Sequence, residues 1–156
     1  MRQEGIPQER GDAAGELPTE TVPPMKPLDP LDLLHCFLRL RPDASIEPLP
    51  VDASFAGRLQ RGELGDFHHE YLVSMFDFDR DWPVWECHPS GDEVVCLLSG
   101  SVRFVLETGD GAESRDLREP GAFLIVPRGT WHTAKVERSC RMLFLTAGEG
   151  TLHRPA

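Results

Sequence analysis

Four side chains that can bind a metal ion lie in two short stretches of this sequence. Glu86, His88 and Glu93 belong to the stretch WECHPSGDEVVCLLSG, and His132 belongs to PRGTWHTAKV. Because side chains alternate across a β-strand, Glu86 and His88 are expected to share one face. A carboxylate on a buried face must be paired, hydrated or bound to a cation, since an isolated buried charge is very costly. Two imidazoles and two carboxylates are ligands of Fe(II), Mn(II), Ni(II) and Zn(II), so these residues predict a metal site.

Short β segments account for most of the chain after residue 66. Each is rich in Val, Leu, Phe or Ile, and turn residues separate them: HHEYLVSMFDF, VWECH, EVVCLLS, SVRFVLE, AFLIVP, TWHTAKV and RMLFLTA. Strands at about ten-residue spacing, without amphipathic helices between them, predict an antiparallel sandwich or barrel. The four metal-capable residues lie on three of these segments, so neighbouring strands are expected to bring them together.

The order and spacing of these residues resemble the two motifs of the cupin family. The first motif, G(x)5HxH(x)3,4E(x)6G, maps onto Glu86-x-His88-(x)4-Glu93-(x)6-Gly100. The second, G(x)5PxGxxH(x)3N, maps onto Gly121-(x)5-Pro127-x-Gly129-(x)2-His132. The resemblance covers roughly residues 66–147 and implies an all-β fold, a double-stranded β-helix or jelly-roll barrel. It also implies that Glu86, His88, Glu93 and His132 bind one divalent metal ion.

Three positions depart from the family pattern. Arg80 stands at the leading Gly position and Val136 at the final Asn position, and both are expected to affect turns and packing. Glu86 replaces the first His and changes the chemistry, because two His and two Glu make a harder, more anionic site that favours Fe(II) or Mn(II), with Zn(II) or Ni(II) as alternatives. If Glu86 instead pairs with Arg103 or reaches solvent, a two-His, one-carboxylate face remains.

Composition narrows the classes of partner. The chain has 156 residues, a one-domain length, with 26 acidic against 16 basic residues and a formal charge of −10. That charge repels phosphate backbones and anionic lipids, so neither nucleic acid nor a membrane is expected as a partner. No apolar run reaches the roughly 20 residues that a spanning helix needs, and no signal core is visible, so a cytoplasmic location is expected. The four cysteines form no CxxC pair, which favours reduced thiols.

Four regions follow from the change in composition along the chain. Residues 1–27 are rich in Pro, Gly and acids, which predicts a flexible tail. Residues 28–65 are expected to pack on the barrel as an N-terminal extension; LDLLHCFLRL leaves helix and strand open, and DASFAGRL suggests a helical turn. The barrel spans 66–147. Residues 148–156 are assigned to a C-terminal tail, which either frays or folds over the barrel mouth and offers Arg154 to an anionic substrate.

Two functions remain open at this stage. The first is a metal-dependent enzyme acting on a small organic molecule, since dioxygenation, isomerisation and lyase chemistry all occur in families that this sequence resembles. The second is a non-catalytic cupin module that binds or senses a small ligand. The resemblance also implies a homodimer, for which the exposed strand edges of a short barrel give a physical reason. Neither the substrate nor the reaction follows from the motifs.

Overall fold

The computed structural model describes residues 30–156, so the tail predicted over residues 1–27 lies outside the described residues. The described residues form nine strands and one short helix: β1 (Cys36–Leu40), β2 (Ile46–Pro50), α1 (Phe55–Gln60), β3 (Tyr71–Phe78), β4 (Val84–Cys87), β5 (Glu93–Thr108), β6 (Gly111–Leu117), β7 (Phe123–Val126), β8 (His132–Ala147) and β9 (Leu152–Pro155). Within this part of the chain, no helix has the length and apolarity needed to cross a membrane.

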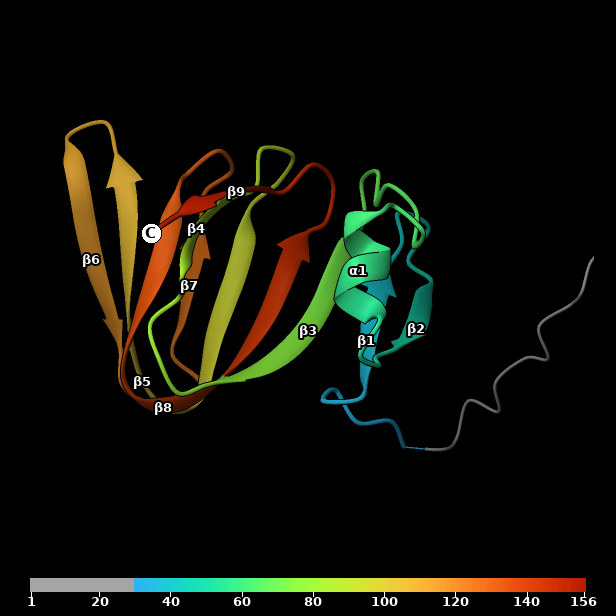
Figure 1. The fold of residues 1–156 in the computed structure, drawn as a ribbon, viewed down its shortest axis with the longest axis horizontal. Helices are drawn as coiled ribbons and strands as arrows, with labels where there is room; N and C mark the ends of the chain where they lie inside the picture. Colours follow the sequence, from blue (N-terminus) through green and yellow to red (C-terminus); the bar gives the residue numbers. More distant parts are fainter. Residues whose placement is uncertain (1–29) are drawn as a thin grey trace, which may run out of the picture. The chain divides into compact units, whose positions relative to one another are not determined.

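Two long strands, β5 and β8, form the centre of the fold. They pair antiparallel from Val94 opposite Leu145 to Leu106 opposite His132. β7 pairs with the first half of β5 and β6 with the second, while β4 pairs with the start of β8 and β3 with its second half. The β5–β8 pair therefore runs through two sheets, β2-β1-β3-β8-β5-β7 and β9-β4-β8-β5-β6 (Figure 1). This is a double-stranded β-helix, or jelly roll, so the predicted fold class is confirmed.

A glycine lets β5 pass from one sheet to the other without a break. Gly100 has a φ of +82°, and a Cβ atom there would lie 2.1 Å from the carbonyl oxygen of Ser139 on β8. The register between the two strands is irregular from Leu97 to Arg103, where both strands bend (Figure 1). The sequence predicted two strands, EVVCLLS and SVRFVLE, separated at this glycine. The structure joins them, because a residue without a side chain permits the bend while the strand pairing resumes on both sides.

The core lies between the two sheets and explains the direction of the site residues. Alternate residues of β5 are buried, and Glu93 occupies the first position of the inward-facing row that continues with Val95 and Leu97. His132 likewise shares the inward face of β8 with Ala134. The buried apolar cluster comprises Trp82, Val95, Leu97, Val102, Phe104, Leu106, Leu117, Val126, Ala134, Cys140, Met142 and Phe144. The polar residues thus lie at one end of an apolar core.

The extension before the barrel continues one of the sheets. The segment LDLLHCFLRL, which left helix and strand open, forms a turn and then β1, which pairs with β2 and β3. The segment DASFAGRL contains all of α1 except its last residue, and Oδ1 of Asp52 accepts a hydrogen bond from the backbone N–H of Ser54 at 2.8 Å. A second apolar cluster holds these elements together through Phe37, Leu49, Phe55 and Phe67.

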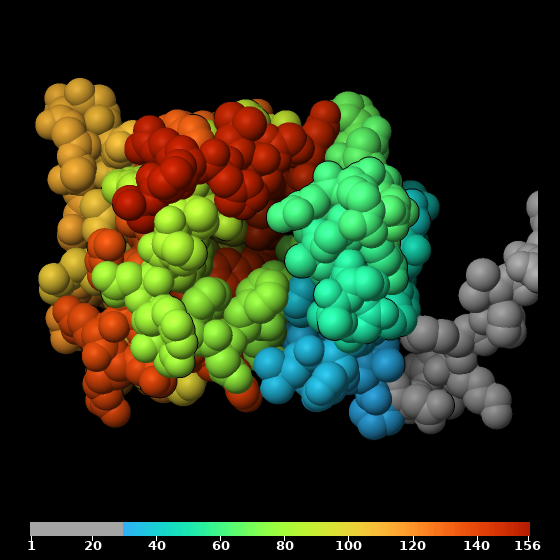
Figure 2. All heavy atoms as spheres, in the orientation of Figure 1, coloured from blue at the N-terminus to red at the C-terminus, as the bar shows by residue number. Residues whose placement is uncertain are grey.

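The last residues form a strand at the surface of the barrel. β9 pairs antiparallel with β4, from Val84 opposite Pro155 to Cys87 opposite Leu152. In Figure 2 the dark red C-terminal residues lie at the surface against the yellow-green residues around β4. Of the two alternatives for residues 148–156, the structure therefore shows a segment that folds onto the barrel and not a frayed tail.

Candidate metal site

Three strands bring the metal-capable side chains to one end of the barrel. Glu86 lies on β4, His88 follows it by two residues, Glu93 begins β5 and His132 begins β8. Glu86 pairs directly with His132 in the β4–β8 ladder. Residues that lie opposite each other in a ladder point to the same face, so this pairing brings the Glu86 carboxylate beside the His132 imidazole. Residues that are distant in the sequence thereby become neighbours.

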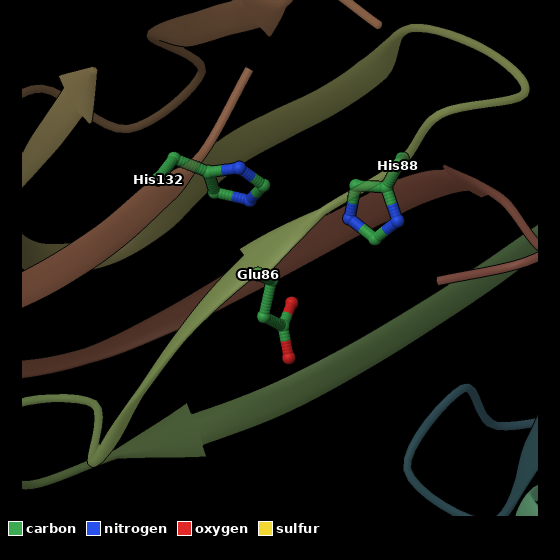
Figure 3. Close-up of side chains that lie close together, drawn as sticks. All are labelled: Glu86, His88 and His132. Carbon is green, nitrogen blue, oxygen red and sulfur yellow. The ribbon is translucent and has the colours of Figure 1, made fainter. Parts of the chain in front are cut away.

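Glu86, His88 and His132 form a potential metal site. Each offers one ligand atom, and these three atoms lie within 4.8 Å of one another. Figure 3 shows the three side chains around a common space, with His132 on β8 and His88 just after the end of β4. The ring centroids of His88 and His132 are 5.4 Å apart. A separation of this size leaves room for one ion that binds to both rings, because metal–nitrogen bonds are about 2 Å long.

Glu93 contacts both imidazoles. Its Oε1 lies 3.4 Å from Nε2 of His88, and its Oε2 lies 3.0 Å from Nε2 of His132. Thr146 donates a hydrogen bond of 2.7 Å to Oε1, which orients the carboxylate. Burial opposes ionisation of Glu93, but the contacts with His132 and His88 outweigh it and lower its pKa to about 2. Glu93 is therefore an anion in contact with both imidazoles of the site.

The atoms that face one another at this site lack hydrogen-bond partners. Nε2 of His88, Nε2 of His132 and Oε2 of Glu93 are fully buried, and none completes a hydrogen bond because their contacts fall outside hydrogen-bond geometry. Buried polar atoms normally find a partner, so three unpaired atoms in one place need an explanation. A divalent cation supplies it, since a metal ion accepts lone pairs from imidazole nitrogen and carboxylate oxygen together. The described residues thus fit the metal predicted from the sequence.

The remaining ring nitrogens help to present the imidazoles. Nδ1 of His132 donates to the backbone carbonyl of Thr130 at 3.1 Å. A carbonyl only accepts, so Nδ1 carries the proton and the lone pair of neutral His132 is on Nε2. Burial lowers the pKa of His132, but the Glu93 carboxylate outweighs burial and the net shift is upward. Nδ1 of His88 lies 3.1 Å from Oγ1 of Thr151, which is on the segment leading into β9.

Glu86 is the most accessible of the four predicted residues. Its side chain is 26% exposed, whereas those of His88, Glu93 and His132 are almost fully buried. Oε1 of Glu86 lies 3.1 Å from Nε2 of His153. The alternative pairing with Arg103 is wrong, because Arg103 pairs with Asp116 and Glu137 instead.

Two residues in contact with the site were missed by sequence reasoning. Thr151 and His153 lie two positions apart in GEGTLHRPA and therefore share a face of an extended segment. That alternation is the one signal the sequence carries, and it does not identify the strand with which β9 pairs. The pairing partner, β4, lies more than sixty residues earlier in the chain.

A separate hollow on the surface lies at the bend of the two long strands. It has a volume of about 440 Å³ and is lined by Asp77, Phe78, Asp79, Ser99, Ser139 and Cys140. None of the metal-capable residues borders it: Glu93 and His132 begin β5 and β8, whereas the hollow borders the middles of these strands. The candidate site and this hollow are therefore two separate places on the barrel.

Comparison with known proteins finds similar structures but no family model or curated protein that matches. Similar structures include a cupin-2 domain protein from Shewanella frigidimarina, hydroquinone 1,2-dioxygenase from Sphingomonas sp. TTNP3 with 4-hydroxybenzoate bound, and an oxalate oxidase. Their identities to this chain are 17%, 18% and 18%, with TM-scores of 0.41, 0.43 and 0.45. The matches cover 55%, 57% and 53% of this chain, and 71%, 62% and 45% of those proteins. Cupins are thus among the similar structures, as the motifs predicted, and the likeness concerns the arrangement of strands.

Proposed function

We propose that this chain is a cupin-type protein that binds one divalent metal ion and uses it on a small organic molecule. The observation that carries the proposal is the set of buried, unpaired atoms contributed by His88, Glu93 and His132. Glu86 is the fourth proposed ligand, because its carboxylate lies within ligand range of both imidazoles. Without a cation, the protein would bury three polar atoms that complete no hydrogen bond and are offset only by the ion-pair contacts of Glu93 with the two imidazoles.

The donor set favours Fe(II) or Mn(II) as the metal. Two imidazoles with two carboxylates place oxygen and nitrogen donors around the ion and supply no thiolate. Cys87 is adjacent to His88 in sequence, but it is the neighbour of Glu86 on β4 and points to the opposite face. Zn(II) and Ni(II) accept the same donors, and elemental analysis separates these alternatives.

The proposed chemistry divides between the ion and the residues of the chain. A divalent ion at this site polarises a substrate oxygen or activates dioxygen. His88, Glu93 and His132 would hold the ion on the buried side of the site. Glu86 borders solvent and is therefore the carboxylate that an entering molecule meets first. Once displaced by a substrate, it is placed to accept a proton as a general base.

The alternative function is a binding module without catalysis. The low exposure of His88, Glu93 and His132 favours it, because a closed ligand set leaves little room for a reacting molecule. The two functions differ in turnover. The protein is first loaded with Fe(II) or Mn(II) under anaerobic conditions. It is then mixed, in the presence of oxygen, with a panel of carbonyl and phenolic compounds, and oxygen consumption and product formation are followed.

The enzyme function predicts metal-dependent conversion of at least one compound class, which is lost in His88→Ala. Binding of compounds with no conversion and no oxygen consumption across the panel would replace it with the binding module. His35→Ala is the matched control for the loss of a histidine, since His35 is exposed and contacts Asp32.

The same proposal includes a homodimer. Among the described strands, β7 pairs with β5 alone, so its other edge is unpaired. Phe123 and Ile125 on this strand are 59% and 53% exposed. An unpaired edge with exposed apolar side chains is a site of association, and a second copy of the chain is the partner that we propose for it.

A further inference from the structure

Glu86 of the candidate site is paired with a histidine on the neighbouring strand on each side. In the two ladders of β4, Glu86 lies opposite His132 of β8 and opposite His153 of β9. Directly opposite residues point to the same face of a sheet. His153, Glu86 and His132 therefore form a row across three adjacent strands. β9 is the outer strand of this row and belongs to the last nine residues of the chain.

Two contacts connect the C-terminal segment to the proposed ligands. Oγ1 of Thr151 lies 3.1 Å from Nδ1 of His88, and Nε2 of His153 lies 3.1 Å from Oε1 of Glu86. Each contact uses an atom that metal binding does not require. Nε2 of His88 is buried without a hydrogen-bond partner, and the His153 contact involves one of the two carboxylate oxygens of Glu86, Oε1. Contacts of this kind fix the rotation of a ligand while leaving its donor atom available.

The other face of β9 holds the strand in place. The guanidinium of Arg154 lies 4.4 Å from the ring centroid of Trp131 and 5.2 Å from that of Trp85. It also forms an ion pair with Glu107 at the end of β5. Cation–π contacts and an ion pair on the outer face stabilise β9 in one register. That register keeps Thr151 and His153 directed at the site.

We propose that the C-terminal strand is part of the metal site, with Thr151 and His153 as positioning residues for His88 and Glu86. This inference rests on the proposed function, because it requires that the site bind a metal ion. Thr151 keeps the His88 ring turned so that Nε2 faces the ion. His153 holds the Glu86 carboxylate at the site. Loss of such outer contacts typically weakens metal binding by about 10- to 100-fold without removing a ligand.

Titration of the full chain with Co(II), with the visible spectrum of the bound ion as a second readout, tests the proposal. Thr151→Val removes the hydroxyl with little change in shape, and Thr151→Ser restores it. We expect Thr151→Val to raise the Kd for Co(II) about tenfold and to change the Co(II) absorption bands, and Thr151→Ser to restore both. His153→Ala is expected to weaken binding similarly, whereas His153→Gln, which keeps a donor, retains more of the affinity.

Leu152→Ala is the matched control, because Leu152 lies on the same strand, is 49% exposed and points away from the site. Its Co(II) affinity and spectrum should equal those of the unmodified protein. The inference is overturned if Thr151→Val and His153→Ala match the unmodified protein in both readouts, or if Leu152→Ala loses as much affinity as they do. In these cases the proposed function still stands, provided that the unmodified protein binds Co(II) and that His88→Ala does not. Absence of Co(II) binding by the unmodified protein would instead overturn the proposed function and this inference together.

Discussion

Oε2 of Glu93 lies 3.0 Å from Nε2 of His132, and neither atom completes a hydrogen bond. Burial lowers the pKa of His132, but the Glu93 carboxylate outweighs burial, so the pKa lies above its usual value of 6.5. Protonated His132 cannot bind a metal ion, since the proton occupies the lone pair that the ion needs. Protons should therefore compete with the metal ion for His132 over a pH range that begins at the ordinary imidazole pKa and extends above it.

This competition predicts the pH dependence of metal binding. A raised pKa keeps His132 protonated to higher pH, so affinity should increase as pH rises from 6 to 8.5 and decrease as pH falls. The decrease should be about tenfold per pH unit for each proton displaced. Isothermal titration in two buffers with different ionisation enthalpies measures both the affinity and the protons released. A Kd that stays constant from pH 6 to 8.5, without proton release, would contradict this interpretation of the pair.

Replacement of Glu86 tests whether the substituted cupin position still acts as a ligand. Glu86→Ala removes the most accessible of the four donors and leaves the three buried ones, so we expect a weaker but measurable metal affinity, with a Kd raised about tenfold. Glu86→His returns the imidazole of the family pattern and should retain metal binding. A Glu86→His protein that binds no metal, while Glu86→Ala still does, would show that position 86 is not a ligand position.

Gly100 is predicted to be essential for the bend of β5. An alanine there combines a φ of +82° with a Cβ atom 2.1 Å from the carbonyl oxygen of Ser139, so Gly100→Ala should lower the free energy of unfolding by about 3 kcal/mol or more. Gly109→Ala is the control, because a Cβ at Gly109 meets no atom within 4 Å. Urea denaturation of both variants measures the difference. Equal stability of the two would mean that the bend does not depend on Gly100.

Association through β7 is tested by changing its exposed side chains. Phe123→Asp and Ile125→Asp place charges where two copies would bury apolar surface, so each should shift a dimer towards monomer. Leu152→Asp is a control at another exposed apolar residue, 49% exposed on β9. Size-exclusion chromatography with light scattering gives the mass directly. A monomeric unmodified protein, or a dimer unaffected by either β7 variant, would exclude this surface as the interface.

Local patterns were sufficient to predict much of the barrel and the inner residues of the site. Alternating apolar residues marked the buried strands, and the motif spacing identified Glu86, His88 and His132, which the structure brings together. The continuity of β5 through Gly100 was harder to predict. A glycine at this place is typical of a turn, and whether the strand ends or bends there depends on its pairing with β8. The strand β6 was missed because most of GAESRDL is polar and lies exposed in a hairpin, so no apolar alternation marks it.

The C-terminal strand shows why the rest of the site was not predictable. β9 has four residues, too few for a clear periodicity, and its partner β4 is distant in sequence. Register between distant strands depends on the packing of both faces, here on Arg154 against Trp85 and Trp131. The contact between His153 and Glu86 follows from that register and from no motif. Local sequence therefore predicts the proposed ligands of the site better than the residues proposed to position them.

The central claim is that His88, Glu93 and His132 hold a divalent ion, and metal content tests it most directly. Protein purified without an affinity tag is analysed for metals, before and after reconstitution with Fe(II), Mn(II) and Zn(II), beside His132→Ala and the control His35→Ala. We expect close to one metal ion per chain in the unmodified protein and in His35→Ala, and loss of that ion in His132→Ala. Full metal occupancy in His132→Ala, or no metal in the unmodified protein even after reconstitution, would contradict the metal site.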